Sequence, residues 1–291
     1  MPSFRQIRYG VAKSKLRAPL VWLRHRGLGP RDTFVASYPR SGSTWLRFQL
    51  FELLTRRESG FQDVNRYIPD VGEHGAAVPL LPNGGRLIKS HEAYRADYKR
   101  AVYVVRDIRD VALSEYAYQR AQGWINGSLD DFLPSFIRGT VNGYGSWQSH
   151  ARSWIDSPLS QDDNLLVVRY GDLRKNTQAV LTRIMDFLEV ESDPKAIETA
   201  IYNNNVQNMR KKEEREPQIG YDPRTKSIAE EKRFVRGGVV GGWKQNLTSA
   251  QIDLLMRNAG ATMSRLGFDS SSLPVAGESQ RQVSMPAVGS K

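Results

Sequence analysis

A run of six residues from Arg40 to Trp45 brings together side chains that suit an anionic ligand. It follows the apolar stretch 33–38 and precedes apolar residues at helical spacing, so it is expected at a strand-to-helix turn. The first N–H groups of a helix are unpaired and lie at the positive end of its dipole. Three hydroxyl side chains add donors, Arg40 adds a cation, and Trp45 adds a flat apolar face. The run therefore predicts a cradle for a phosphate-like group beside an aromatic ring.

Further candidate residues lie where predicted strands end. Lys89, His91, Arg106 and Tyr170 each close, or directly follow, an apolar stretch with strand character. Ligands of open parallel sheets bind beyond the carboxyl ends of the strands. We therefore expect these side chains to share one site with Arg40.

The elements that must position these residues alternate along the chain. Strands are predicted over 33–38, 86–89, 101–105 and 165–170, and helices over 46–55, 111–119, 131–137, 147–155, 179–188, 193–202 and 254–266. The stretch 101–105 is apolar on both faces, as in a buried parallel strand, and Asp107 after it suits a helix N-cap. Strands that alternate with helices predict an α/β fold, with a central parallel sheet and helices on both faces.

Two stretches are predicted to lack regular structure. Residues 59–85 are rich in Gly, Pro, Asn and Asp, and residues 210–236 are highly charged with few apolar side chains. We interpret the second stretch as a mobile, solvated loop. Trp147 and Trp154 are seven residues apart on one helical face and are expected in the core, and we interpret three histidines as structural: His25, His74 and His150.

Composition narrows the class of protein. The chain of 291 residues carries a net charge of +11 and has no cysteine, which excludes disulfides, thiolate zinc sites and cysteine nucleophiles. No apolar run reaches the roughly 20 residues that span a bilayer, and the N-terminus lacks a signal-peptide core. We expect a cytoplasmic protein with a basic extension (1–31), a single domain (32–268) and a disordered tail (269–291).

The extension contains eight Lys and Arg residues and no acidic residue. The favoured interpretation is a segment packed on the domain with its charges solvated. The alternative is a basic amphipathic helix that contacts a membrane surface or a polyanion.

The 40–45 run departs from the nucleotide-binding loop of phosphoryl transferases. That pattern requires Lys after the second Gly, whereas Ser43 follows Gly42 here. The groups that end the strands are cationic or neutral, and Asp107 beyond them is expected as a helix cap, so none suits the Mg²⁺ that phosphoryl transfer normally needs. A sulfuryl group carries one negative charge rather than two, so side-chain cations and N–H groups suffice. The run therefore favours sulfuryl over phosphoryl transfer, without a metal.

Three segments together resemble one family. Residues 37–45, Ser-Tyr-Pro-Arg-Ser-Gly-Ser-Thr-Trp, resemble the 5′-phosphosulfate loop of sulfotransferases that use 3′-phosphoadenosine 5′-phosphosulfate (PAPS). Residues 103–114 are similar to that family's 3′-phosphate motif, and residues 236–244 to its Arg-Lys-Gly-x-x-Gly-Asp-Trp-Lys segment. The resemblance spans about 33–266 and implies the sulfotransferase variant of the P-loop nucleotide-kinase fold.

The resemblance implies a role for each matching position. The 5′-phosphosulfate is expected on Arg40, Ser41, Gly42, Ser43 and Thr44, the adenine on Trp45 and Tyr170, and the 3′-phosphate on Arg106, Ser114, Arg236, Gly237 and Gly238. His91 matches the family's catalytic base and Lys89 the Lys two residues before it. Arg40 and Gly237 each replace a family Lys, and Gly242 replaces an Asp.

The implied mechanism is in-line attack of an acceptor hydroxyl, or less favourably an amine, on sulfur. His91 takes the acceptor proton, Arg40 and Lys89 stabilise the developing charge, and 3′,5′-ADP leaves. Neither a metal nor a covalent intermediate is needed. A metal-dependent P-loop kinase and a non-catalytic polyanion-binding protein remain the alternatives.

The acceptor is left open between a small molecule, a lipid and a glycan, and no nucleic-acid partner is expected. Its pocket is expected in the loops 59–85, 120–145 and 210–235. Aromatic candidates in or near these loops are Phe61, Tyr67, Tyr94, Trp124, Tyr144 and Tyr221. A loose match of residues 244–253 to the family's dimer segment leaves a homodimer open.

Overall fold

The structure of the protein is a computed structural model that describes residues 17–218, 221–222, 227–230 and 233–268. The predicted tail, 269–291, and the first sixteen residues of the basic extension lie outside them. No helix in the described part of the chain is both long and apolar enough to cross a bilayer.

A parallel sheet of four strands forms the centre of the described chain, in the order β2-β1-β3-β4. The strands are β1 (Thr33–Ser37), β2 (Leu87–Ser90), β3 (Arg100–Val105) and β4 (Leu165–Arg169). Since all four run the same way, their carboxyl ends lie on one edge. The loop after β1, His91, Arg106 and Tyr170 therefore start from the same edge of the sheet, as the sequence predicts.

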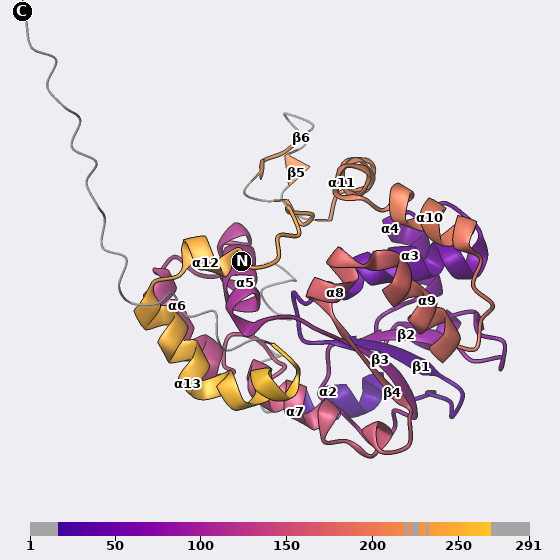
Figure 1. Cartoon of the computed structure of the whole chain (residues 1–291), viewed down its shortest axis with the longest axis horizontal. Helices are drawn as coiled ribbons and strands as arrows, with labels where there is room; N and C mark the ends of the chain where they lie inside the picture. The colour runs from indigo at the N-terminus through magenta and orange to yellow at the C-terminus, as the bar shows by residue number, and fades with distance from the viewer. Residues whose placement is uncertain (1–16, 219–220, 223–226, 231–232, 269–291) are drawn as a thin grey trace, which may run out of the picture.

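Helices cover both faces of this sheet (Figure 1). They are α2 (Arg17–Arg24), α3 (Ser43–Thr55), α4 (Phe61–Tyr67), α5 (Ile108–Ala121), α6 (Leu129–Arg138), α7 (Trp147–Ile155), α8 (Tyr170–Lys175), α9 (Thr177–Phe187), α10 (Pro194–Asn203), α11 (Val206–Arg215), α12 (Trp243–Asn246) and α13 (Ser249–Arg265). Short 3₁₀ turns span His74–Ala76 and Pro158–Ser160, and a small hairpin pairs β5 (Tyr221–Asp222) with β6 (Ser227–Ile228). The α/β fold with helices on both faces is confirmed.

Successive side chains along each strand point to opposite faces of the sheet and pack into two separate hydrophobic cores. Phe34 and Tyr103 pack with α5, α6, α7 and α13 on one face, whereas Val35 and Val102 pack with α3, α4, α9 and α10 on the other. Trp147 and Trp154 are buried in the first core, which confirms their predicted place. The Asp107 carboxylate accepts from the Arg109 N–H and caps α5, as expected.

The two stretches predicted to be irregular each contain helix, at 61–67 and at 210–215, so the predictions are wrong there, whereas most of the other described residues of both stretches lack regular structure. In 59–85, α4 forms because Phe61 and Val64 bury one face, with the Phe61 ring 4.7 Å from that of Phe48. In 210–236, α11 extends to Arg215, and Lys212 and Glu213 are buried rather than solvated.

Partners far away in sequence explain the buried charges of α11. The Lys212 ammonium lies 3.1 Å from the Glu52 carboxylate and also donates to Ser59 Oγ. The Glu213 carboxylate accepts from the backbone N–H groups of Phe234 and Val235. A buried charge persists when it is paired in this way.

Candidate functional site

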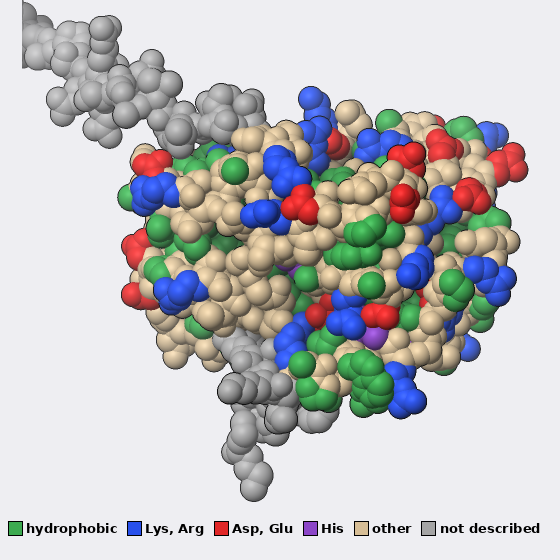
Figure 2. Space-filling model, turned by 90° about the horizontal axis from the view of Figure 1, so that it is seen from below, with side chains coloured by type: hydrophobic (Ala, Val, Ile, Leu, Met, Phe, Trp, Pro, Cys, Tyr) green, Lys and Arg blue, Asp and Glu red, His purple; other side chains and the backbone are tan. Residues whose placement is uncertain are grey.

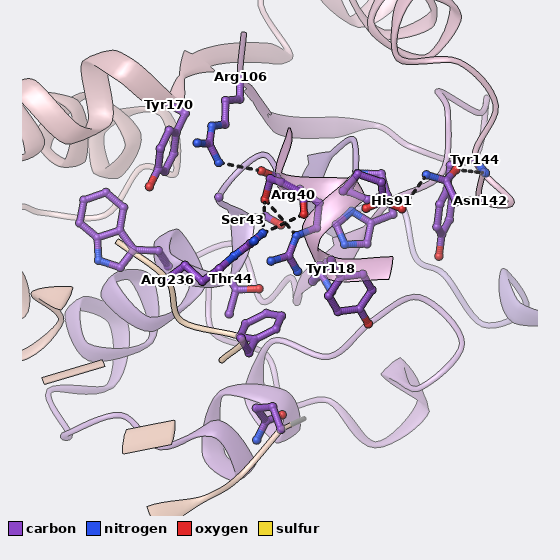
Figure 3. Close-up of a pocket in the computed structure, with 18 of the residues that line it drawn as sticks. Arg40, Ser43, Thr44, His91, Arg106, Tyr118, Asn142, Tyr144, Tyr170 and Arg236 are labelled. Carbon is purple, nitrogen blue, oxygen red and sulfur yellow. Dashed lines mark hydrogen bonds between the residues drawn. The ribbon is translucent and has the colours of Figure 1, made fainter. Parts of the chain in front are cut away.

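A cavity of about 920 Å³ opens at the carboxyl edge of the sheet. It gathers most of the predicted site residues, drawn in part in Figure 3: Arg40, Gly42, Ser43, Thr44, Trp45, Lys89, His91, Arg106, Ser114, Tyr170, Arg236 and Gly238. Ser41 and Gly237 do not line it. The Ser41 side chain is buried, and its Oγ has no hydrogen-bond partner within the described chain.

The loop between β1 and α3 has an unusual backbone. Arg40 and Gly42 have positive φ angles of 66° and 100°. A Cβ added to Gly42 would lie 2.4 Å from the Tyr170 ring, so only glycine fits there. No side chain caps the N-terminus of α3, and Ser43 Oγ accepts from Ser37 Oγ at 2.9 Å. The first N–H groups of α3 are thus left for an anion, as the sequence predicts.

Three guanidinium groups surround Ser114 and the Arg40 backbone. Arg40 Nε lies 3.3 Å and Arg236 Nη2 3.1 Å from Ser114 Oγ. Arg106 Nη1 lies 3.3 Å from the Arg40 carbonyl oxygen. Burial, followed by the charges of Arg40 and Arg106, lowers the pKa of Arg236 to about 10. Cations held this close to one another make a strong anion site.

The Gly-rich segment 236–242 is held down on the cavity by Asp110. Its carboxylate accepts from the backbone N–H groups of Gly241 at 2.9 Å and Trp243 at 3.1 Å. Arg106 Nη2 adds a bond of 2.8 Å to the Val239 carbonyl. The segment therefore closes over the arginine cluster, and sequence reasoning missed Asp110 as its anchor.

An aromatic slot lies beside the arginine cluster. The Trp45 ring stands edge-on to the Tyr170 ring at 6.2 Å, and Trp45 Nε1 donates to the Asn204 carbonyl. The Arg174 guanidinium lies 4.8 Å from the centre of the Trp45 ring. Tyr170, predicted at the end of a strand, is the first residue of α8. Sequence reasoning missed Arg174 and Asn204, because only folding brings α8 and the end of α10 to Trp45.

The His91 side chain faces the cavity, and one of its two ring nitrogens is already hydrogen-bonded within the protein. Its Nδ1 lies 2.7 Å from the Ser37 carbonyl oxygen, which can only accept, so Nδ1 carries the proton and Nε2 is the acceptor in the neutral ring. Burial, followed by the charge of Lys89, lowers the pKa of His91 to about 3. The ring is therefore neutral at physiological pH, with Nε2 unprotonated.

Lys89 lines the cavity but has a carboxylate partner. Its Nζ lies 3.0 Å from Asp70 Oδ1, and residues 70 and 89 also form a backbone bridge. Although burial alone would raise it, Lys89 and Arg47 hold the pKa of Asp70 well below its usual range. Part of the Lys89 charge is thus neutralised within the protein.

The other end of the cavity, beyond His91, is mainly aromatic. Tyr144 stands 5.7 Å from the His91 ring, and Tyr118 stands 5.7 Å from Trp124. Figure 3 shows Arg40 with His91 and Tyr144 on one side and Arg106 and Tyr170 on the other. Of the aromatic residues expected to form an acceptor pocket, Trp124 and Tyr144 line the cavity, whereas Phe61 is buried in the core.

The residues of the arginine end fit a nucleotide with phosphate groups at two positions. The uncapped α3 N-terminus with Arg40 and the cluster of Arg106, Ser114 and Arg236 supply two adjoining anion sites, and the Trp45 slot lies beside them. No three His, Asp or Glu side chains in the described chain are grouped so as to hold a metal ion.

Known sulfotransferases resemble this chain in sequence and fold. Sulfotransferase 2A1 of Mus musculus is 28% identical over 236 residues, which cover 76% of this chain and 80% of that protein. Sulfotransferase 1E1 of Homo sapiens is 27% identical over 248 residues, covering 76% and 80%. A crystal structure of retinol dehydratase with androsterone and inactive cofactor PAP has a TM-score of 0.66 and 22% identity, and the match covers 83% of each chain.

The family model described as "Sulfotransferase domain" matches residues 30–267, well over half of the chain. This match includes all three motifs and every candidate residue assigned above from the cavity. The protein therefore belongs to the PAPS-dependent sulfotransferase family that its motifs resemble.

Proposed function

We propose that this protein transfers the sulfuryl group of PAPS to a hydroxyl group of an apolar small molecule. Family membership supports the reaction class, and PAP in the structure of retinol dehydratase supports the donor. The observation that carries the proposal is the arrangement of one cavity. An arginine cluster fills one end, aromatic rings line the other, and a neutral His91 lies between them.

Each group of residues at the nucleotide end of the cavity has a proposed role. Arg40, Ser43, Thr44 and the first N–H groups of α3 hold the 5′-phosphosulfate, which supplies the sulfuryl group when PAPS is bound. Ser41 and Gly237 act through the backbone or the shape of their loops, because their side-chain positions do not line the cavity.

The 3′-phosphate is assigned to Arg106, Ser114 and Arg236. The adenine is assigned to the slot of Trp45 and Tyr170, with Gly238 above it, since the Tyr170 hydroxyl lies 3.3 Å from the Gly238 carbonyl oxygen. Arg174 lies on one face of Trp45, so the base stacks there only if that guanidinium moves aside.

His91 is the proposed base. The acceptor oxygen forms the new bond to sulfur while His91 Nε2 takes its proton, and the bond from sulfur to the nucleotide oxygen breaks. The Ser37 carbonyl fixes the tautomer in which Nε2 is unprotonated. Arg40 and Lys89 offset the negative charge that develops on the leaving oxygen, with Lys89 shared between this role and Asp70.

An apolar ring system is the acceptor class that this end of the cavity favours. Leu20, Val21, Trp124 and Tyr144 supply apolar walls, and the polar side chains of Arg17, Arg24 and Asn142 also line the cavity. A glycan would need several hydrogen-bonding partners along its length. A homodimer and a cytoplasmic location remain predictions.

The test mixes the protein with PAPS and a panel of sterols, phenols and sugars and measures the release of 3′,5′-ADP. We expect turnover with ring alcohols or phenols. His91→Ala is expected to lower kcat by about a hundredfold or more, because a positioned base is lost. Its affinity for 3′,5′-ADP in calorimetry should stay unchanged, since His91 lies outside the arginine cluster.

Tyr202→Ala, an exposed substitution on α10 outside the cavity, is the matched control and should change neither quantity. Failure of both PAPS and 3′,5′-ADP to bind would overturn the proposed donor. Turnover that survives in His91→Ala would overturn the proposed base.

A further inference from the structure

Helix α2 packs on the domain with its polar face inward. Arg17 is paired with Glu92, and its guanidinium lies 4.8 Å from the centre of the Tyr144 ring. Arg24 Nε donates to the Val71 carbonyl at 3.0 Å, and the buried His25 is bonded to the Tyr98 hydroxyl at 2.7 Å. A helix on the surface of a water-soluble protein normally turns its apolar face towards the core and its charged side chains towards solvent. In α2 this order is reversed.

The outward face of α2 is apolar. Leu20, Trp22 and Leu23 are 43%, 62% and 54% exposed, and they are three of the seven exposed large hydrophobic residues in the described chain. The Arg26 guanidinium lies 5.3 Å from the centre of the Trp22 ring. Figure 2 shows hydrophobic side chains gathered near the lower edge of the view, with basic, acidic and His side chains beside them. Nothing in the described chain covers them.

The charge of the surrounding sequence indicates which kind of partner suits the outer face of α2. Residues 1–31 carry eight Lys and Arg and no acidic residue. In a symmetric dimer the same patch meets itself, so a second copy would bring two such basic segments together. Arg17 and Arg24 are held by the domain. An anionic lipid surface instead offers opposite charge to the other basic residues of 1–31 and an apolar interior to Trp22 and Leu23. Tryptophan is also enriched at the membrane interface.

The same helix forms a wall of the cavity. Arg17, Leu20, Val21 and Arg24 line it, at the end where Tyr144 stands beside His91. A surface bound to the outer face of α2 would therefore lie next to the acceptor end, away from the arginine cluster.

We propose that α2 docks the protein on an anionic lipid bilayer, with Trp22 and Leu23 inserted between the headgroups. This docking does not depend on the proposed function. Its consequence does rest on that function: an amphipathic acceptor dissolved in the bilayer reaches His91 past Leu20 without crossing bulk water.

The experiment measures co-sedimentation of the full chain with vesicles of phosphatidylcholine, alone or mixed with phosphatidylglycerol. We expect binding to the mixed vesicles only. Binding should weaken as salt rises from about 0.1 M to about 1 M, where the screening length falls from roughly 10 Å to 3 Å. Trp22→Ala/Leu23→Ala should lower the bound fraction about tenfold, because two inserted side chains are lost.

Val78→Ala/Tyr202→Ala removes two exposed hydrophobic residues elsewhere and is the matched control, expected to bind like the unchanged protein. Neither Trp22 nor Leu23 lines the cavity, so turnover of a water-soluble acceptor should persist in their double variant. Equal binding to both vesicle types, or unchanged binding of the Trp22/Leu23 variant, would overturn the proposal. So would sedimentation velocity that shows a dimer abolished by the same double change. His91→Ala should bind vesicles normally, which separates failure of docking from failure of sulfuryl transfer.

Discussion

The imidazole of His91 is held neutral by its surroundings, because burial and the nearby Lys89 charge both disfavour the protonated ring. Its tautomer is set by a backbone carbonyl, so no acidic side chain is needed to orient it. As the proposed base, His91 would need no prior deprotonation step.

The pH dependence of kcat/KM for PAPS tests this state of the free enzyme. An ordinary histidine loses half of its basic form at about pH 6.5. His91, with its pKa lowered to about 3, should keep its basic form well below that value. We therefore expect kcat/KM to stay flat between about pH 8 and pH 5.5. An acidic limb centred near pH 6.5 would contradict a lowered pKa of His91.

At the scale of residues, the sequence predicts those site residues that belong to one of the three motifs. Arg40, Arg106, Ser114 and Arg236 converge as expected. The partner of Lys89 was not predicted, because Asp70 reaches it through a bridge between segments 19 residues apart. Such pairs depend on how loops are arranged in space, and the residue types near each partner do not show this.

At the scale of elements, the β1–α3 loop and α8 constrain each other. The Tyr170 ring occupies the space that a side chain on Gly42 would need, and the φ angle of Gly42 is strained for any other residue. The loop proposed to hold the 5′ end of the nucleotide and the ring proposed to contact adenine therefore fit together as one unit.

Gly42→Ala tests this fit. The added methyl group meets Tyr170 in a backbone conformation that alanine avoids, so we expect a loss of about 1–3 kcal/mol in the free energy of unfolding. Nucleotide affinity should fall as well, because Tyr170 and Arg40 are displaced. Urea unfolding and calorimetry with 3′,5′-ADP measure the two effects. Gly75→Ala is the matched control, since nothing lies within 4 Å of its added Cβ; equal effects of the two changes would argue against the clash.

The predictability of elements follows from where their stabilising contacts lie. The sheet strands and the Asp107 cap were predicted because alternation and capping are local patterns. Helices α4 and α11 were missed because their buried faces are completed by Phe48 and Glu52 on α3, far away in sequence. A polar, Gly-rich or charged composition predicts a loop correctly only when no residue far away in sequence packs against that segment.

At the scale of the whole molecule, all four histidines have lowered pKa values. Burial is the first cause in each case, and the pKa of His150 falls to about 4. Since the unfolded chain takes up these protons first as pH falls below about 6.5, acidification stabilises the unfolded state. The free energy of unfolding should therefore decrease towards acid.

We expect a decrease on the order of 1 kcal/mol per pH unit for each of His91 and His150 between about pH 6.5 and pH 5, because their pKa values fall to about 3 and about 4. Asp110 and Glu213, whose pKa values burial raises, act in the opposite sense at lower pH, so the measurement stays above pH 5. Urea unfolding across this range gives the slope. His150→Asn should make it shallower, whereas a free energy that is flat or rises towards acid would contradict the assignment.

The overall fold was predictable because the three motifs fix both the family and the edge of the sheet that carries the site. The orientation of α2 was not. Its sequence is amphipathic in either direction, and only the contacts of Arg17 with Glu92 and of Arg24 with Val71 turn its arginines inward. The favoured interpretation, charges left in solvent, is wrong for these two residues.

The position of α2 also has a consequence for redesign. The helix lies before residue 30, where the match to the sulfotransferase domain begins, yet it supplies a wall of the acceptor end. The helix and the residue after it are joined to the domain through Glu92, Val71 and Tyr98. Exchanging Leu20 and Val21 for smaller or larger residues offers a route to new acceptors that leaves Arg40, Arg106 and Arg236 in place.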